Sequence, residues 1–169
     1  MCRRINRSTR FITVLLLLCS MSVFALPEDD EADIQITSEQ FTYNHQTGVA
    51  TYTGDVLAVQ GSRKLTGDEM QVYRLPNGKI EKIITLGEQA KYQALTENDK
   101  PMLYARANTI VYDVAGKQLR LIHDAHVEQG GDAYASPLIE YDTLQRIVKS
   151  PQSASGRTTI TLQPQNEGS

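Results

Sequence analysis

A tyrosine followed within five residues by a glycine recurs along this chain, and this repeat constrains the fold more than any other feature. The repeated pairs are Tyr43 and Gly48, Tyr73 and Gly78, and Tyr112 and Gly116, with a fourth copy, Tyr141 to Arg146, that lacks the glycine. Successive tyrosines lie 30, 39 and 29 residues apart, and the longest interval holds a polar insert at 96–101. Self-similarity at 20–50 residues indicates stacked supersecondary units, none of which can bury its apolar face alone.

Between these pairs, apolar and polar residues alternate with the period of two that is typical of a half-buried β-strand. The predicted inward sets are Leu119, Leu121, Ala125 and Val127; Ile84, Leu86, Ala90 and Tyr92; Tyr52, Val56 and Ala58; Met70 and Val72; and Ile160 and Leu162. Between Leu119 and Val127, Arg120, Asp124, His126 and Glu128 take the other face. No stretch of ten or more residues has helical periodicity. The alternation therefore predicts an all-β protein.

The units also align with one another internally. Residues 54–61 (GDVLAVQG) match 123–130 (HDAHVEQG), and the Asn77-Gly78 and Gly130-Gly131 pairs are hairpin signals. Hairpin after hairpin, with one apolar face per strand, predicts an open antiparallel jelly roll or sandwich of two packed sheets. The strands near 34–36 and 158–162 should then lie at opposite ends of the stack, with no capping helix.

The N-terminus is predicted to be a cleaved signal peptide, residues 1–25. Four arginines precede an apolar run at 11–19 that is too short to span a membrane, and cleavage is expected after Ala25. A lipoprotein acylated at Cys19 is the alternative, but Leu18 occupies the position where that processing prefers a small residue. We expect an acidic disordered leader at 26–33, one domain at 34–162 and a disordered tail at 163–169.

Removal of the signal changes the composition of the chain. Both cysteines leave with it, so the mature chain has no thiol for a disulfide or a metal site. The remaining 144 residues carry 13 basic and 20 acidic side chains, a net charge of −7. This charge argues against a nucleic-acid partner, because such proteins need a basic face. Secretion into the periplasm and a single domain are therefore predicted.

No catalytic or metal-binding constellation is visible. His123 and His126 flank Asp124, but residues three apart on a strand point to opposite faces, and His45 stands alone. The segment 153–156 (SASG) lacks the features of a nucleophile elbow, and Asp68-Glu69 has no orienting partner. We predict a protein that is not an enzyme and has no cofactor.

The apolar face has two interpretations. A closed sandwich core is the ordinary one. The sequence also lacks Trp, has only three Phe, and places Gly54, Ala58, Ala90 and Ala125 among the inward positions, which would leave space between the sheets. That space favours an apolar groove.

Seven segments, in order, carry a resemblance to a known family. They are 34–40 (IQITSEQ), 48–56 (GVATYTGDV), 60–61 (QG), 67–70 (GDEM), 87–92 (GEQAKY), 105–112 (ARANTIVY) and 156–162 (GRTTITL). In these segments the chain resembles the OstA-like domain family of periplasmic lipopolysaccharide transport proteins, over nearly all of its mature length. The chain departs from the family pattern in a slightly longer loop at 43–48 and in His123, where the family usually has glycine.

The resemblance implies a V-shaped open jelly roll that shields the acyl chains of lipid A. It also implies passage of lipopolysaccharide from an inner-membrane transporter to an outer-membrane translocon, and head-to-tail oligomers joined through edge strands. Strand parity then gives the lipid-groove candidates Tyr52, Val56, Met70, Val72, Ile84, Leu86, Leu119, Leu121 and Val127. The candidate partner edges are Ile34 and Ile36 at one end and Ile160 and Leu162 at the other. A periplasmic structural or adaptor sandwich and a carbohydrate-active enzyme are the alternatives.

Overall fold

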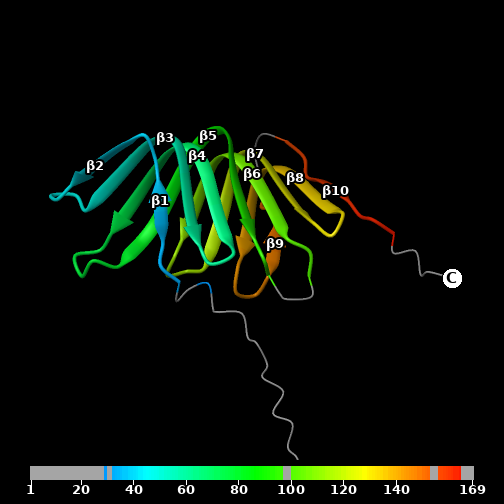
Figure 1. The fold of residues 1–169 in the computed structure, drawn as a ribbon. Coiled ribbons are helices and arrows are strands. Elements are labelled where there is room, and N and C mark those ends of the chain that lie inside the picture. The colour runs from blue at the N-terminus through cyan, green and yellow to red at the C-terminus, as the bar shows by residue number, and fades with distance from the viewer. Residues whose placement is uncertain (1–28, 30–31, 97–99, 153–155, 165–169) are drawn as a thin grey trace, which may run out of the picture.

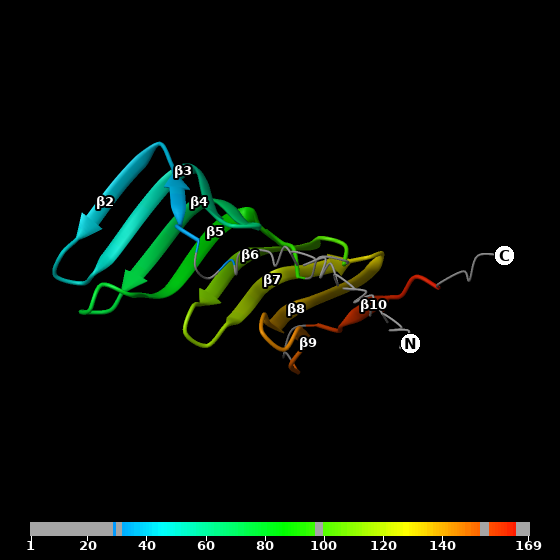
Figure 2. The same ribbon diagram turned by 60° about the horizontal axis from the view of Figure 1, so that its bottom comes forward.

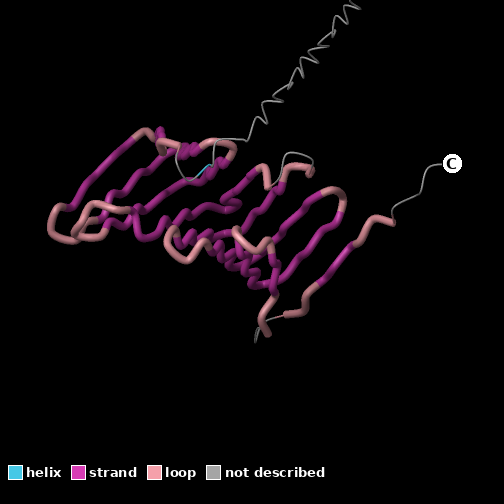
Figure 3. The backbone as a smooth tube through the Cα atoms, turned by 90° about the horizontal axis from the view of Figure 1, so that it is seen from below, coloured by secondary structure: helices cyan, strands magenta, loops and turns pink. Residues whose placement is uncertain are grey.

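Ten antiparallel strands form one sheet in the computed structural model, which describes residues 29, 32–96, 100–152 and 156–164 (Figure 1). The predicted signal peptide lies outside these residues. The strands are β1 (Gln35–Thr37), β2 (Gln40–Asn44), β3 (Val49–Gln60), β4 (Arg63–Arg74), β5 (Ile80–Ala94), β6 (Leu103–Asp113), β7 (Gln118–Gln129), β8 (Asp132–Asp142), β9 (Ile147–Lys149) and β10 (Thr159–Thr161). Figure 3 shows how much of the described backbone is strand. In these ranges no helix is long and apolar enough to cross a membrane.

The strand order follows the chain. The path is β1-β3-β4-β5-β6-β7-β8-β10, with β2 paired to β3 and β9 paired to β8. The end strands β1 and β2 therefore lie at one end of the molecule, and β9 and β10 lie at the other (Figure 2). The four tyrosine-led turns connect β2 to β3, β4 to β5, β6 to β7 and β8 to β9. The predicted open, antiparallel fold built from hairpin repeats is confirmed.

The long strands lose register with their neighbours near mid-length. The irregularities lie at 53–56 in β3, 66–69 in β4, 86–90 in β5, 106–109 in β6 and 122–125 in β7. Gly54 and Asp55 have φ of 82° and 42°, and the aligned His123 and Asp124 have 61° and 51°. Because bulges bend strands and increase their twist, this row of irregularities forms a crease across the sheet.

The crease divides the sheet into two arms, between which the chain alternates. Arm A consists of β1, residues 56–67, 90–96, 100–107 and 125–136, and β10. Arm B consists of residues 40–53, 69–86, 109–122 and 138–149, including β2 and β9. All four tyrosine-led turns thus fall on the free rim of arm B. Each sequence repeat therefore forms two strands: the first runs from arm B to arm A, and the second returns from arm A to arm B.

Candidate functional site

The interior lies between the two arms, whose inward faces differ in side-chain size. Arm B contributes the large buried residues Met70, Val72, Ile83, Ile110, Tyr112, Leu119, Leu121, Ile139 and Tyr141. Arm A contributes six buried alanines and five larger buried residues: Ala58, Ala90, Ala94, Ala105, Ala107 and Ala125, with Val56, Leu65, Tyr92, Leu103 and Val127. All of these belong to a single apolar cluster. Large residues facing small ones allow two layers to fill the space between them.

The interior is consequently filled in this structure and does not form an open trough. Its apolar cavity measures only about 30 Å³. Ala58, Leu65 and Tyr92 line this cavity from arm A, and Ile83 and Tyr112 line it from arm B. The alanines that were predicted to leave space are themselves buried, each at most 6% exposed, within the same apolar cluster. The alternation of residues along one strand predicts which side chains point inward, but it does not predict which side chains pack against them.

Six of the nine predicted groove residues are buried in this interior. They are Val56, Met70, Val72, Leu119, Leu121 and Val127, each at most 1% exposed. A seventh, Tyr52, is partly buried and packs against the same cluster, with its ring 5.0 Å from that of Phe41. The structure therefore brings these seven residues to one apolar interior, from β3, β4 and β7.

The inward prediction is wrong for Ile84 and Leu86. In β5 the buried residues are Ile83 and Thr85, whereas Ile84 and Leu86 are only partly buried and lie on the outer face. The register of β5 shifts between Leu86 and Ala90, so the inward parity differs on the two sides of the crease. Alternation counted through a bulge places one half of the strand on the wrong face.

Sequence reasoning missed several interior residues on β5, β6 and β8. They are Ile83, Thr85, Ile110, Tyr112, Ile139 and Tyr141. The pairs on β6 and β8 are spaced by two residues, so the same alternation rule would have found them. The segment 83–86 (IITL) is apolar at three of four positions and gives no alternation to follow.

Two buried hydroxyls stand in the interior without partners. Within the described ranges, Thr85 Oγ1 and Tyr112 Oη are buried and have no hydrogen-bond partner. Burial raises the pKa of Tyr92, with nearby Arg63 acting in the opposite direction, and burial also raises the pKa of Tyr141. Unsatisfied buried hydroxyls cost stability, and they leave donors available to a ligand that enters between the arms.

The two ends of the sheet expose apolar side chains. At the first end Ile34 lines the small cavity, Ile36 packs against the interior, and Phe41 on β2 is 59% exposed. At the other end Ile160 and Leu162 are 56% and 65% exposed. Ile160 pairs with Tyr134, which packs against the interior, so the apolar face of arm A continues to the edge of the sheet.

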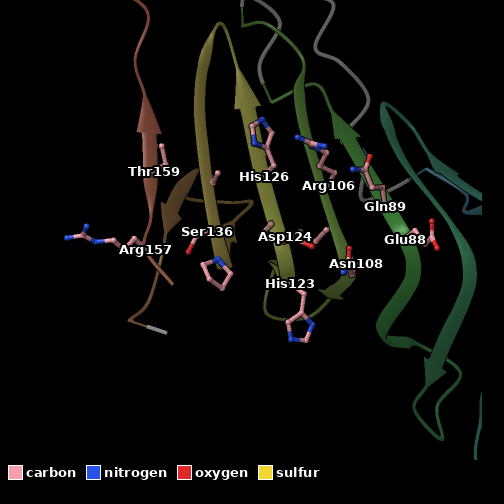
Figure 4. A pocket seen from close by; sticks show the side chains of 14 residues that line it. Glu88, Gln89, Arg106, Asn108, His123, Asp124, His126, Ser136, Arg157 and Thr159 are labelled. Atoms are coloured by element: carbon pink, nitrogen blue, oxygen red, sulfur yellow. The ribbon is translucent and has the colours of Figure 1, made fainter. Parts of the chain in front are cut away.

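A second, larger hollow lies on the outer side of the crease and is polar (Figure 4). It measures about 620 Å³ and is lined by side chains that include Arg106, His123, His126 and Arg157. Because the bulge intervenes between them, both histidines line this hollow, contrary to the opposite faces expected on a regular strand. No group of three or more His, Cys, Asp or Glu residues able to hold a metal occurs within the described ranges. A polar lining does not suit acyl chains.

Fold and interior together define a class: proteins whose one bent antiparallel sheet encloses an apolar interior between two arms. Residues 35–146 match the family model described as LptA/(LptD N-terminal domain) LPS transport protein. The chain belongs to this family. The function that this family model describes, lipopolysaccharide transport by an LptA-type protein, is non-enzymatic, in agreement with the prediction that this chain is not an enzyme.

The relatives support the same assignment. Lipopolysaccharide export system protein LptH of Pseudomonas aeruginosa is 32% identical over 157 residues, which cover 89% of this chain and 90% of LptH. Lipopolysaccharide export system protein LptA of Escherichia coli K12 is 28% identical, covering 88% of this chain and 80% of the relative. The crystal structure of LptH, described as the LptA homologous periplasmic component of the lipopolysaccharide transport device, superimposes with a TM-score of 0.75 at 33% identity. That match covers 82% of this chain and 100% of the LptH chain.

Proposed function

We propose that this protein is a periplasmic carrier that holds the acyl chains of lipopolysaccharide between its two arms. In this proposal the protein passes the lipid from an inner-membrane transporter to an outer-membrane translocon. The single observation that carries the proposal is the continuous apolar interior formed by both arms of a bent sheet whose fold matches that of LptH. The seven predicted groove residues that reach this interior are its proposed lipid contacts.

Transport requires such an interior because acyl chains are costly to expose to water. At ~0.8 kcal/mol per methylene, a chain of about a dozen carbons costs roughly 10 kcal/mol to hydrate. An interior with a cavity of about 30 Å³ cannot receive such a chain unless the arms separate. Strand pairing in the described residues runs along the sheet, and no pairing joins the rims of arm A and arm B. We therefore propose that the arms part at their rims when cargo enters.

Exposed edges support the proposal that copies assemble end to end. Edge strands carry unpaired backbone groups, which a partner strand can use for pairing. The exposed Ile160 and Leu162 at one end, and Ile36 at the other, would extend the apolar face from one copy to the next. Sedimentation over a range of concentrations tests this, and a strictly monomeric profile at high concentration contradicts it.

Photo-crosslinking to lipopolysaccharide tests the carrier proposal directly. Leu121 and Arg120 are neighbours on β7, but Leu121 is fully buried in the interior and Arg120 lies on the outer face. A photoreactive residue at 121 should crosslink to the lipid, and one at 120 should not. The pair Val127 and Glu128 repeats the comparison on arm A. Equal labelling within both pairs contradicts the proposed site.

The filled interior favours one alternative, a periplasmic structural or adaptor protein without cargo. Depletion separates the two functions. Loss of a carrier should make lipopolysaccharide accumulate at the inner membrane, whereas loss of an adaptor should not. A native mass spectrum of the protein purified from the periplasm adds a second readout, because a carrier should retain co-purified lipid.

A further inference from the structure

The turn between β3 and β4 holds a carboxylate that comes from the segment preceding the sheet. Asp29 Oδ1 accepts a hydrogen bond from the backbone N–H of Ser62 at 2.7 Å, and Asp29 Oδ2 accepts one from Ser62 Oγ at 2.7 Å. The guanidinium of Arg63 lies 3.6 Å from Oδ2. A backbone amide, a hydroxyl and a guanidinium thus converge on one anion, separated from the turn by more than thirty positions in the sequence.

The turn is arranged for an anion by its own surroundings. Ser62 Oγ also accepts a hydrogen bond from the backbone N–H of Leu95 at 3.1 Å, which fixes the hydroxyl against the end of β5. Gly61 has φ of 58°, and a Cβ added there would overlap Asp29 Oδ1. The glycine therefore supplies both the left-handed turn and the space that the anion occupies.

This turn lies at the free rim of arm A, beside the apolar cavity. Arg63 and Gln60 line that cavity together with Tyr112, whose buried hydroxyl has no partner. Gln60 Nε2 also donates to the carbonyl oxygen of Ala32 at 3.2 Å, and Ile34 lines the cavity. Ala32 and Ile34, which follow Asp29 in the sequence, thus lie at the same rim, beside the cavity.

We propose that Gly61, Ser62 and Arg63 form a phosphate site for the headgroup of the lipid cargo, and that Asp29 is a latch that occupies this site when cargo is absent. The Asp29 carboxylate stands in for a phosphate, because both groups accept charge-assisted hydrogen bonds from the same donors. A phosphate at the rim would leave the acyl chains of the same molecule pointing between the arms. This inference rests on the proposed carrier function and adds a headgroup site and a means of regulating entry.

Because Asp29 occupies the phosphate site, a ligand binds there only if it displaces this carboxylate. A group on the same chain has an effective concentration on the order of millimolar at its site, so Asp29 competes well with free anions in solution. A phosphorylated lipid gains additional free energy from burying its acyl chains and can displace the latch. Displacement would also release Ala32 and Ile34 from the rim, so headgroup binding and opening of the cavity are coupled.

The experiment compares two lipids on four variants of the protein purified from the periplasm. The lipids are lipid A with its phosphates and lipid A from which the phosphates have been removed. Asp29→Asn is paired with Asp33→Asn, an exposed acid on the same segment. Arg63→Met is paired with Lys64→Met, the neighbouring exposed cation on the outward side of β4. Unfolding midpoints verify that each variant is folded.

We expect Asp29→Asn to bind phosphorylated lipid A about tenfold more tightly, and Arg63→Met about tenfold more weakly, than the wild type. Arg63→Met should not change binding of the dephosphorylated lipid, Asp29→Asn should tighten it by less than it tightens binding of the phosphorylated lipid, and both controls should behave as the wild type. Equal effects on both lipids would overturn the phosphate site while leaving the carrier function intact. Failure of the wild type to bind either lipid would refute the carrier function itself. Inorganic phosphate that binds Asp29→Asn as tightly as the phosphorylated lipid does would reveal a free-anion site and overturn the assignment to cargo.

Discussion

Strands β3 to β8 contribute to both arms, yet the two arms differ in the size of the side chains that they place in the interior. The inward face of arm B carries nine large buried apolar residues and one alanine, whereas that of arm A carries six alanines beside five larger residues. Strands β3 to β8 each cross the crease, and the inward side chains of one strand can differ in size on its two sides. On β7, for example, Leu119 and Leu121 lie on arm B, and Ala125 lies on arm A.

This difference shows how a hinged interior can be closed and still be able to receive cargo. The alanines of arm A and the large side chains of arm B are buried in one apolar cluster, and no backbone pairing joins the two rims in the described residues. If the arms part, the short alanine side chains leave space beside arm A for acyl chains. Arm B then offers these chains a broad apolar surface. Arm B should therefore carry most of the packing energy, and arm A should determine the available space.

Truncating a large residue on arm B should have the largest effect. Leu121→Ala should lower the free energy of unfolding by about 3 kcal/mol, because it removes buried methyl groups and leaves a cavity. Ala125→Gly, on the same strand in arm A, should cost only about 1 kcal/mol. Urea unfolding of both variants measures the difference. Equal losses would show that the two arms contribute alike.

Enlarging a small residue on arm A should have the next largest effect. Ala105 is 4% exposed and lies between Tyr92 and Val127 on the neighbouring strands. Ala105→Leu should destabilise the protein by about 2 kcal/mol through overpacking. Glu128→Leu, on the outer face of the same arm, serves as the control and should change stability by less than about 0.5 kcal/mol. A neutral Ala105→Leu would mean that arm A has free space in the closed state.

The sequence was sufficient to predict the strands, the turns and much of the inward parity. Alternation and the tyrosine–glycine pairs depend on neighbouring residues, so they can be read from one strand at a time. Leu119, Leu121 and Val127 were placed correctly for this reason, since the two left-handed residues His123 and Asp124 preserve parity across the crease of β7.

What escaped prediction depends on contacts between distant segments. The register shift in β5 reverses parity at the crease, so Ile84 and Leu86 were assigned to the wrong face. The match between 54–61 and 123–130 was visible, but nothing local shows that both segments begin at a crease. The alanines were visible too, although only the folded sheet shows that they are buried. The contact of Asp29 with Ser62 also escaped prediction, because it joins two residues 33 positions apart in the sequence.

The stability at high pH compares the two arms without a substitution that creates a cavity. Burial raises the pKa of Tyr92 on arm A and of Tyr141 on arm B above the ordinary value of 10.0. A raised pKa in the folded state means that the unfolded state loses its proton first. Stability should therefore be unchanged below about pH 10 and should fall above it by up to ~1.4 kcal/mol per pH unit for each tyrosine.

Denaturant unfolding between pH 8 and pH 11 tests this expectation. Tyr92→Phe and Tyr141→Phe should each make the alkaline loss less steep. Tyr104→Phe, which alters a tyrosine that is 53% exposed, should keep the wild-type dependence on pH. A wild-type stability that is flat through pH 11 would contradict the burial of both phenols.

The smallest effect should come from the outer face of arm B, directly behind its most buried residues. Arg120 and Glu140 form an ion pair at 3.4 Å, with side chains 50% and 33% exposed. Exposed pairs gain little because water and salt screen them, so Arg120→Ala should cost less than about 0.5 kcal/mol. A double-mutant cycle with Glu140→Ala, repeated in high salt, measures the coupling between the two side chains. A coupling above about 1 kcal/mol would mean that the outer face also stabilises arm B, and the large loss expected for Leu121→Ala could no longer be assigned to the interior alone.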